Sequence, residues 1–195
     1  MFIDDTIAAV ATAPGEAGIG IVRLSGPKAL DIANKIFKPI KGNTDLSMQV
    51  RKLVYGHVYD QDKVIDEVLI SYMKKPHTFT REDVVEINCH GGYISVRRIL
   101  ESVIRNGARL ADRGEFTKRA FLNGRIDLSQ AEAIIDIINA KTNASFDIAQ
   151  KHLEGNLSAS IKQIRDKLTM DLAKITVAID FPEEDEPEVT YEELS

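Results

Sequence analysis

The sequence contains a single cysteine, Cys89, and no apolar run that approaches the roughly 20 residues of a membrane-spanning helix. One cysteine excludes an internal disulfide framework and fits a reducing compartment. The first residues, Met1 to Asp5, lack the basic start and the long apolar core of a signal peptide. These absences predict a soluble, cytoplasmic protein without a membrane contact.

Several motifs that carry enzyme chemistry are also missing. No Gly-x-x-x-x-Gly-Lys-Ser/Thr occurs in the chain, which excludes a P-loop GTPase active site from it. No Gly-x-Ser-x-Gly elbow occurs either. Cys89 and His90 are adjacent in a predicted strand and so point to opposite faces, and the other histidines are scattered. We therefore predict no catalytic residue and no metal site.

The charge that is present is unevenly distributed. Residues 1–118 carry 17 Lys and Arg against 15 Asp and Glu, whereas residues 119–195 carry 8 against 15. Seven of those acids fall within residues 183–193, which indicates a solvated acidic tail or linker. The net charge of −5 argues against a general nucleic-acid coat, so a phosphate-binding surface is expected, if anywhere, in the first part.

The hydrophobic pattern changes along the chain. The first part alternates short β-branched runs with amphipathic helices, which predicts an α+β domain rather than a doubly wound sheet. Strands are expected at residues 6–12, 18–25, 53–59, 64–73 and 84–90, and helices at residues 27–37 and 94–104. We place this domain at residues 1–118, the first part of a helical domain at 119–182, and the acidic tail or linker at 183–195.

Helix punctuation concentrates at the junction of these parts. Gly124 can end one short helix, and the next can be capped by Asp127 with Gln130 or by Ser129 with Glu132. That second helix is expected at residues 128–140. A further amphipathic helix of roughly 36 residues follows, interrupted at most locally at Gly155, and its apolar face needs a partner helix.

Two polar residues interrupt apolar strands in the first part. Arg23 precedes Ser25-Gly26 and can hold a carboxylate or phosphate, or form a surface ion pair. Glu86 lies within Val-Val-Glu-Ile, where alternation alone can place a carboxylate on a polar face. Its alternative role is to accept hydrogen bonds from the amide edge of a pterin-like ring.

Residues 116–133, Phe-Thr-Lys-Arg-Ala-Phe-Leu-Asn-Gly-Arg-Ile-Asp-Leu-Ser-Gln-Ala-Glu-Ala, resemble the junction segment of the MnmE (TrmE) tRNA-modification GTPases. Matching stretches at residues 5–9, 20–27, 89–92 and 178–184 extend the resemblance over the whole chain. It implies an N-terminal domain similar to the tetrahydrofolate-binding domain of glycine-cleavage T-protein, followed by a helical domain into which a GTPase domain is inserted. This chain stops before that insertion, so we expect a truncated form that does not hydrolyse GTP alone.

The resemblance also implies a function. The family binds a 5-formyltetrahydrofolate-type donor, forms a homodimer through the N-terminal domain, and acts with the flavoprotein MnmG (GidA). Together they install a carboxymethylaminomethyl-type group on the wobble uridine of tRNA, while GTP, Mg²⁺ and K⁺ belong to the absent GTPase domain. The family's folate contacts match Arg23, Glu86 and Arg125, with His90, Gly91 and Gly92 as further lining. A folate-dependent aminomethyl or formyl transferase of the T-protein kind is the alternative.

Overall fold

The computed structural model describes residues 4–42 and 45–180, which form two compact units, and each unit is described by itself. The first unit ends at Arg125 and the second begins at Ile126. The boundary expected after residue 118 falls within helix α3 (Glu115–Leu122), which belongs to the first unit, where its Arg119 bonds to Asp5 and Glu82. The expected acidic tail at residues 183–195 lies outside the described residues.

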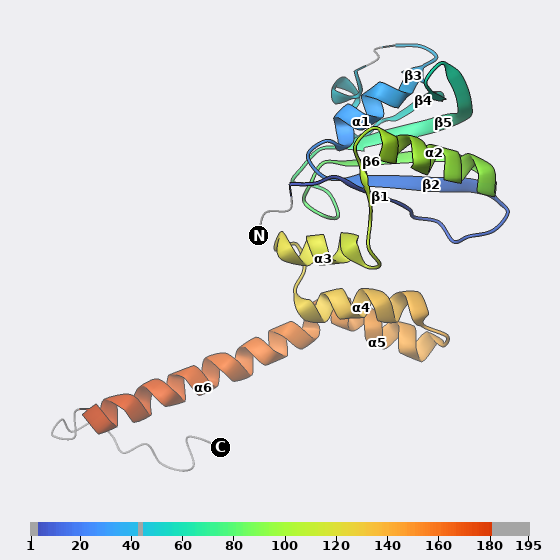
Figure 1. Cartoon of the computed structure of the whole chain (residues 1–195). Helices are drawn as coiled ribbons and strands as arrows, with labels where there is room; N and C mark the ends of the chain where they lie inside the picture. The colour runs from blue at the N-terminus through green and yellow to red at the C-terminus, as the bar shows by residue number, and fades with distance from the viewer. Residues whose placement is uncertain (1–3, 43–44, 181–195) are drawn as a thin grey trace. The chain divides into compact units, whose positions relative to one another are not determined.

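The first unit is built on one seven-stranded sheet. Its strands are β1 (Ile7–Val10), β2 (Ala17–Ser25), β3 (Phe37–Pro39), β4 (Leu53–Asp60), β5 (Lys63–Met73), β6 (Val84–Gly91) and β7 (Arg109–Leu110). Their order is β3-β4-β5-β6-β2-β1-β7 (Figure 1), and only the β1–β7 pair is parallel. The predicted α+β class is confirmed, whereas the short strands β3 and β7 were not predicted.

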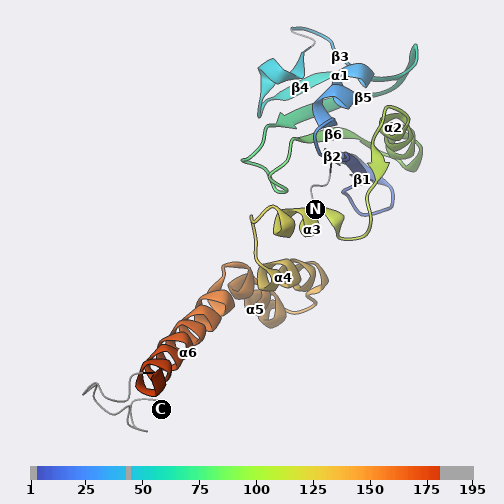
Figure 2. The same ribbon diagram turned by 60° about the vertical axis from the view of Figure 1, so that its left-hand side comes forward.

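One face of the sheet carries the hydrophobic core. In β2, Val22 and Leu24 are fully buried on this face, and alternation turns Arg23 to the other face. Helices α1 (Ala29–Ile36) and α2 (Tyr93–Arg105) both pack on the core face (Figures 1 and 2). As predicted, Asn106 and Gly107 end α2, with Gly107 in a positive-φ conformation that favours glycine. The opposite face of β2, β4, β5 and β6 is called the open face here.

Helix α3 lies beyond the β1 side of the sheet (Figures 1 and 2). It ends at Leu122, and Gly124 then takes φ +68°, as expected for a glycine that terminates a helix. The 3₁₀ helix η1 (Leu46–Gln49) interrupts the polar segment before β4, and the side chain of Asp45 accepts a hydrogen bond from the backbone N–H of Ser47.

The second unit contains α4 (Leu128–Asn139), α5 (Asn143–Leu153) and α6 (Asn156–Asp180). Of the two capping registers considered, the structure forms the one in which Asp127 and Gln130 bond reciprocally at 2.9 and 3.0 Å. Gly155, at φ +89°, separates α5 from α6, so the predicted long helix is two helices.

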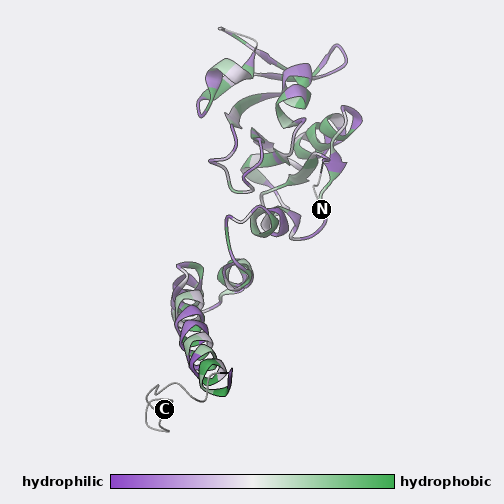
Figure 3. Ribbon diagram, turned by 90° about the vertical axis from the view of Figure 1, so that its left-hand side faces the viewer, coloured by the Kyte–Doolittle hydropathy of each residue, from purple (hydrophilic) through white to green (hydrophobic). Residues whose placement is uncertain are grey.

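Helices α5 and α6, which stand in place of the predicted long helix, differ in how much of their apolar surface is covered. Helix α5 packs on α4, where the side chain of Gln130 donates a hydrogen bond to the carbonyl of Leu153 at 2.8 Å. Helix α6 instead exposes an apolar stripe that contains Ile161, Ile164, Leu168 and Leu172. Figure 3 shows that hydrophobic and hydrophilic residues share this helix. Within residues 4–42 and 45–180, no helix is both long and apolar enough to cross a membrane.

Candidate functional site

Arg23 and Glu86 form an ion pair on the open face of the sheet. They are cross-strand neighbours in β2 and β6, and Nε and Nη2 of Arg23 lie 2.8 and 2.7 Å from Oε1 of Glu86. Their side chains are 33% and 24% exposed. Because both arginine nitrogens engage the same oxygen, Oε2 of Glu86 accepts no hydrogen bond from the described residues. The pair therefore presents a half-buried acceptor beside a guanidinium.

Two phenylalanine rings accompany the predicted arginines. The guanidinium of Arg23 lies 5.8 Å from the ring centre of Phe116 in α3, and that of Arg125 lies 4.7 Å from the ring centre of Phe79. Both distances are within the range of cation–π attraction. The structure thus pairs Arg23 directly with Glu86, and it places Arg125 at the end of the helix that contacts Arg23.

The segment that contains Phe79 is bonded to the same part of β2. The hydroxyl of Thr80 lies 2.6 Å from that of Ser25, which shares the open face with Arg23. The side-chain amide of Asn123, just after α3, donates to the carbonyl of Thr80 at 2.6 Å. These bonds connect β2, the segment before β6 and the end of α3 around the predicted site.

His90, Gly91 and Gly92 lie at the far end of β6 from Arg23. His90 is four residues beyond Glu86, which corresponds to about 13 Å along a strand. Its Nδ1 lies 2.7 Å from Oδ1 of Asp66, and its backbone N–H donates to Oδ2 of the same carboxylate. The hydrogen bond and the charge of Asp66 raise the pKa of His90. Of the predicted site residues on β2 and β6, the structure brings only Arg23 and Glu86 into contact.

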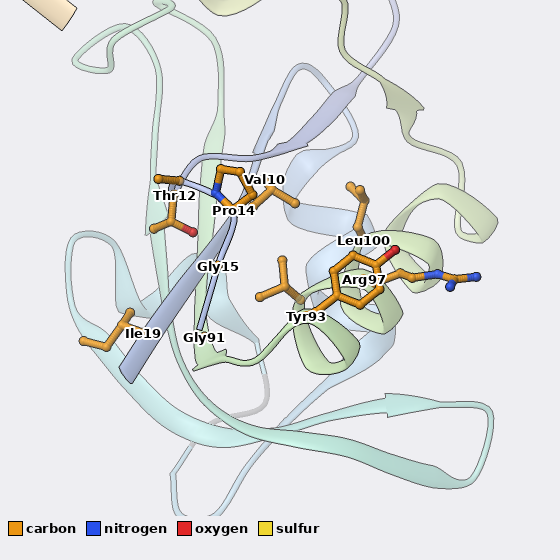
Figure 4. A pocket seen from close by; sticks show the side chains of 11 residues that line it. Val10, Thr12, Pro14, Gly15, Ile19, Gly91, Tyr93, Arg97 and Leu100 are labelled. Carbon is orange, nitrogen blue, oxygen red and sulfur yellow. The ribbon is translucent and has the colours of Figure 1, made fainter. Parts of the chain in front are cut away.

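An apolar cavity of about 420 Å³ lies between the loop after β1 and helix α2. Figure 4 shows Tyr93 and Leu100 of α2 facing Val10 and Pro14, with Gly91 at the base. Val10 belongs to the core face of β1, whereas Arg23 and Glu86 lie on the open face. The cavity is therefore separate from the ion pair.

Gly91 and Gly92 differ in the space available to a side chain. A Cβ at Gly91 would lie 2.3 Å from the carbonyl oxygen of Ala17, whereas one at Gly92 would meet nothing within 4 Å. We expect Gly91→Ala to lower the free energy of unfolding by about 1–3 kcal/mol, as overpacking does elsewhere. Gly92→Ala is the matched control, and urea unfolding compares the two. Equal stability of both variants would contradict the steric argument.

A network of ion pairs centred on the buried Arg119, which the sequence did not reveal, holds α3. Arg119 is fully buried and bonds to Asp5 Oδ1 at 2.6 Å, to Glu115 Oε1 at 3.1 Å, and to both carboxylate oxygens of Glu82 at 3.2 Å. Arg109 reaches Glu115 at 2.6 Å and Asp5 at 2.7 Å. Glu115 and Arg119 are four residues apart on one helix face, a spacing that could have suggested the pair.

The network continues into the candidate site. Oε2 of Glu82 accepts a hydrogen bond from the hydroxyl of Ser25 at 2.6 Å, two residues from Arg23. Arg119 therefore connects α3, through Glu82, to the open face of β2. Helix α3 also carries Phe116, which contacts Arg23, and it leads into Arg125. By holding α3 in place, the network therefore helps to position both Arg23 and Arg125.

Acid is expected to weaken this network. Hydrogen bonds from the side chain of Arg109 lower the pKa of Glu115 from 4.5 to about 2. Burial opposes this shift, whereas hydrogen bonds from the backbone N–H of Asp112 and the side chain of Arg119 add to it. A carboxylate whose pKa is lowered in the folded state stabilises the fold at pH values above its pKa in the unfolded chain. This contribution is lost as the pH falls from about 4.5 to 2. The stability difference between the wild type and Glu115→Gln should therefore shrink across this window. Urea midpoints, followed by amide NMR signals of β2, measure it; a difference independent of pH would refute the assignment.

Comparison with known proteins identifies the family. The family described as GTP-binding protein TrmE N-terminus matches residues 6–125, and the MnmE helical domain matches residues 128–195. The tRNA modification GTPase MnmE of Clostridioides difficile (strain 630) is 59% identical over 194 residues, which cover 100% of this chain and 42% of that protein. That of Bacillus subtilis (strain 168) is 54% identical over 186 residues, covering 94% and 40%. The chain spans about two fifths of these relatives' length, and it belongs to the MnmE (TrmE) family, with the N-terminal and helical regions of that family.

Proposed function

We propose that the first unit binds a 5-formyltetrahydrofolate-type one-carbon donor, with the Arg23–Glu86 pair as its recognition element. The free Oε2 of Glu86 carries this proposal. A pterin ring presents adjacent amide and amine N–H donors, and a carboxylate oxygen that is half-buried and already oriented is a matching acceptor. The arginine holds the carboxylate of Glu86 in place, so the acceptor does not have to be ordered when the ligand binds.

The surrounding residues suit the rest of such a ligand. Phe116 and Phe79 offer ring faces beside the two guanidiniums, and small-molecule sites combine apolar walls with few polar groups in this way. Arg125 is exposed and suits a glutamate carboxylate of the folate tail. The bound folate supplies the one-carbon unit, while these residues bind and orient it.

We further propose that the first unit forms a homodimer. Leu53 and Tyr55 of β4 and Leu69 of β5 are 64%, 45% and 41% exposed. Tyr55 and Leu69 are cross-strand partners, and all three lie on the open face. Contiguous exposed apolar side chains of this kind mark interaction surfaces.

The similar proteins are tRNA modification GTPases, which supports a place for this chain in tRNA modification. We propose that this chain is the folate-binding and dimerising part of a cytoplasmic tRNA-modification GTPase that acts with MnmG (GidA) on the wobble uridine. GTP, Mg²⁺ and K⁺ would serve the GTPase part of the longer relatives. The T-protein-like transferase alternative has no comparable support.

Calorimetric titration of the chain with 5-formyltetrahydrofolate, beside a light-scattering mass, tests the proposal. We expect one folate per chain and the mass of a dimer. If this chain does not bind but a full-length relative does, the site requires additional chain and the proposal for this part alone fails. Absence of binding in both would reject the folate role altogether.

A further inference from the structure

The segment between β5 and β6 turns its threonines inward and its basic residues outward. Thr78 and Thr80 are buried, and their hydroxyls bond to the carbonyl of Glu82 at 2.7 Å and to Ser25 at 2.6 Å. His77 and Arg81, which alternate with them, are exposed. The hydrogen bonds of the threonines therefore fix the backbone that presents these outward side chains.

The acidic residues of the segment are directed away from this outer side. Glu82 bonds to Ser25 and to the buried Arg119. Asp83 accepts from the backbone N–H of Lys75 at 2.9 Å, and burial together with this carboxylate raises the pKa of Tyr72 to about 12. Neither carboxylate neutralises the exposed cations of the segment.

Three guanidiniums near this segment bond to carbonyl groups or rings instead of carboxylates. Arg81 donates to the carbonyl of Asn123 at 3.0 Å, Arg51 donates to the carbonyl of His77, and Arg125 stacks on Phe79. Within residues 4–42 and 45–180, none of the three has a carboxylate within 4 Å, unlike Arg23 and Arg119. With His77 and the exposed lysines of the segment they form a set that we call the basic loop surface: Arg51, Lys74, Lys75, His77, Arg81 and Arg125.

We propose that the basic loop surface binds the additional γ-linked carboxylates of a polyglutamylated folate. The inference rests on the proposed function, because the surface begins at Arg125, the residue assigned there to the folate tail. Each γ-glutamyl residue adds one carboxylate to a flexible chain, and guanidiniums without a carboxylate partner can receive such groups in bidentate geometry. A short run of carboxylates matches a surface confined to one loop and its neighbours.

A nucleic-acid phosphate backbone is the other polyanion that such a surface could receive. The basic loop surface is confined to one loop and its neighbours, whereas non-specific nucleic-acid binding depends on many phosphate contacts. The observations therefore favour the smaller ligand, and an oligonucleotide serves as a competing probe in the test.

The test compares 5-formyltetrahydrofolate with its triglutamate by calorimetry on the whole chain at about 0.1 M salt, where screening acts beyond about 10 Å. We expect the triglutamate to bind about tenfold more tightly. Lys75→Ala combined with Arg81→Ala should remove most of this advantage and leave the monoglutamate affinity unchanged. Lys63→Ala combined with Arg98→Ala is the control, because it removes the same charge from exposed positions elsewhere.

Each other outcome has a defined meaning. Equal affinity for the two folates overturns the tail-binding inference and leaves the proposed function intact. Absence of binding by either folate overturns both. If a single-stranded RNA oligonucleotide binds the wild type but not the Lys75→Ala, Arg81→Ala variant, and the triglutamate has no advantage, the surface binds phosphate and the inference is wrong.

Discussion

Arg119→Met is expected to lower the free energy of unfolding of the first unit by about 3–5 kcal/mol, the cost of removing one partner from a buried ion pair. Arg119 is fully buried and is bonded to the carboxylates of Asp5, Glu82 and Glu115. Methionine fills similar space without charge, so most of the loss should come from Glu115 and Glu82, whose side chains are only 7% and 16% exposed and which lose this cation. Native-state hydrogen exchange of the β2 and β6 amides reports this free energy directly.

The matched control is Arg97→Met. Arg97 also pairs with a glutamate four residues away, Glu101, but the two side chains are 58% and 44% exposed. Exposed pairs contribute little to stability, so the exchange rates should not change measurably. If Arg119→Met proved as mild as this control, the buried network would not be what holds α3 on the sheet.

The second large effect concerns ligand affinity. We expect Arg23→Ala and Glu86→Ala each to weaken 5-formyltetrahydrofolate binding at least about tenfold, or about 1.4 kcal/mol. The glutamate loses the acceptor proposed for the pterin edge, and the arginine loses the group that orients that acceptor. Calorimetric titration of each purified variant, with circular dichroism to verify folding, measures the change.

An ion pair of the same residue types supplies the control for these variants. Arg97→Ala and Glu101→Ala disrupt an exposed Arg–Glu pair on α2, which packs on the core face of the sheet rather than the open face. Their folate affinity should equal that of the wild type. Unchanged affinity in the Arg23 and Glu86 variants, with intact folding, would disprove the site assignment.

Local signals in the sequence were sufficient to predict most of the helices and strands. The β-branched runs predicted the long strands, and the Asp127–Gln130 spacing predicted a capping box that the structure contains. Alternation within β6 allowed a polar-face position for Glu86, and the structure places both Arg23 and Glu86 on the face opposite the core as direct partners. Their proximity was not predictable, because register between strands distant in sequence depends on the whole sheet.

The features that were missed depend on contacts between distant residues. Strand β7 contains only Arg109 and Leu110, and it pairs with β1 about a hundred residues earlier in the chain. Arg119 lies in a polar stretch whose composition suggests a solvent-exposed helix, and its burial depends on carboxylates far away in the sequence, at Asp5 and Glu82, as well as on Glu115 of the same helix. For the same reason, the division between the units lies after Arg125 rather than within α3.

The pairing of Asp5 with Arg119 has a consequence for the order of events during translation. The two residues are 114 positions apart, so the ion pair cannot form until nearly the whole first unit has left the ribosome. Before that point, the carboxylates of Asp5 and Glu82, just before β1 and β6, lack the guanidinium that they share. Emergence of α3 is therefore the step at which the nascent first unit can form this ion-pair network, and by then the ribosomal exit tunnel already holds the start of the helical unit.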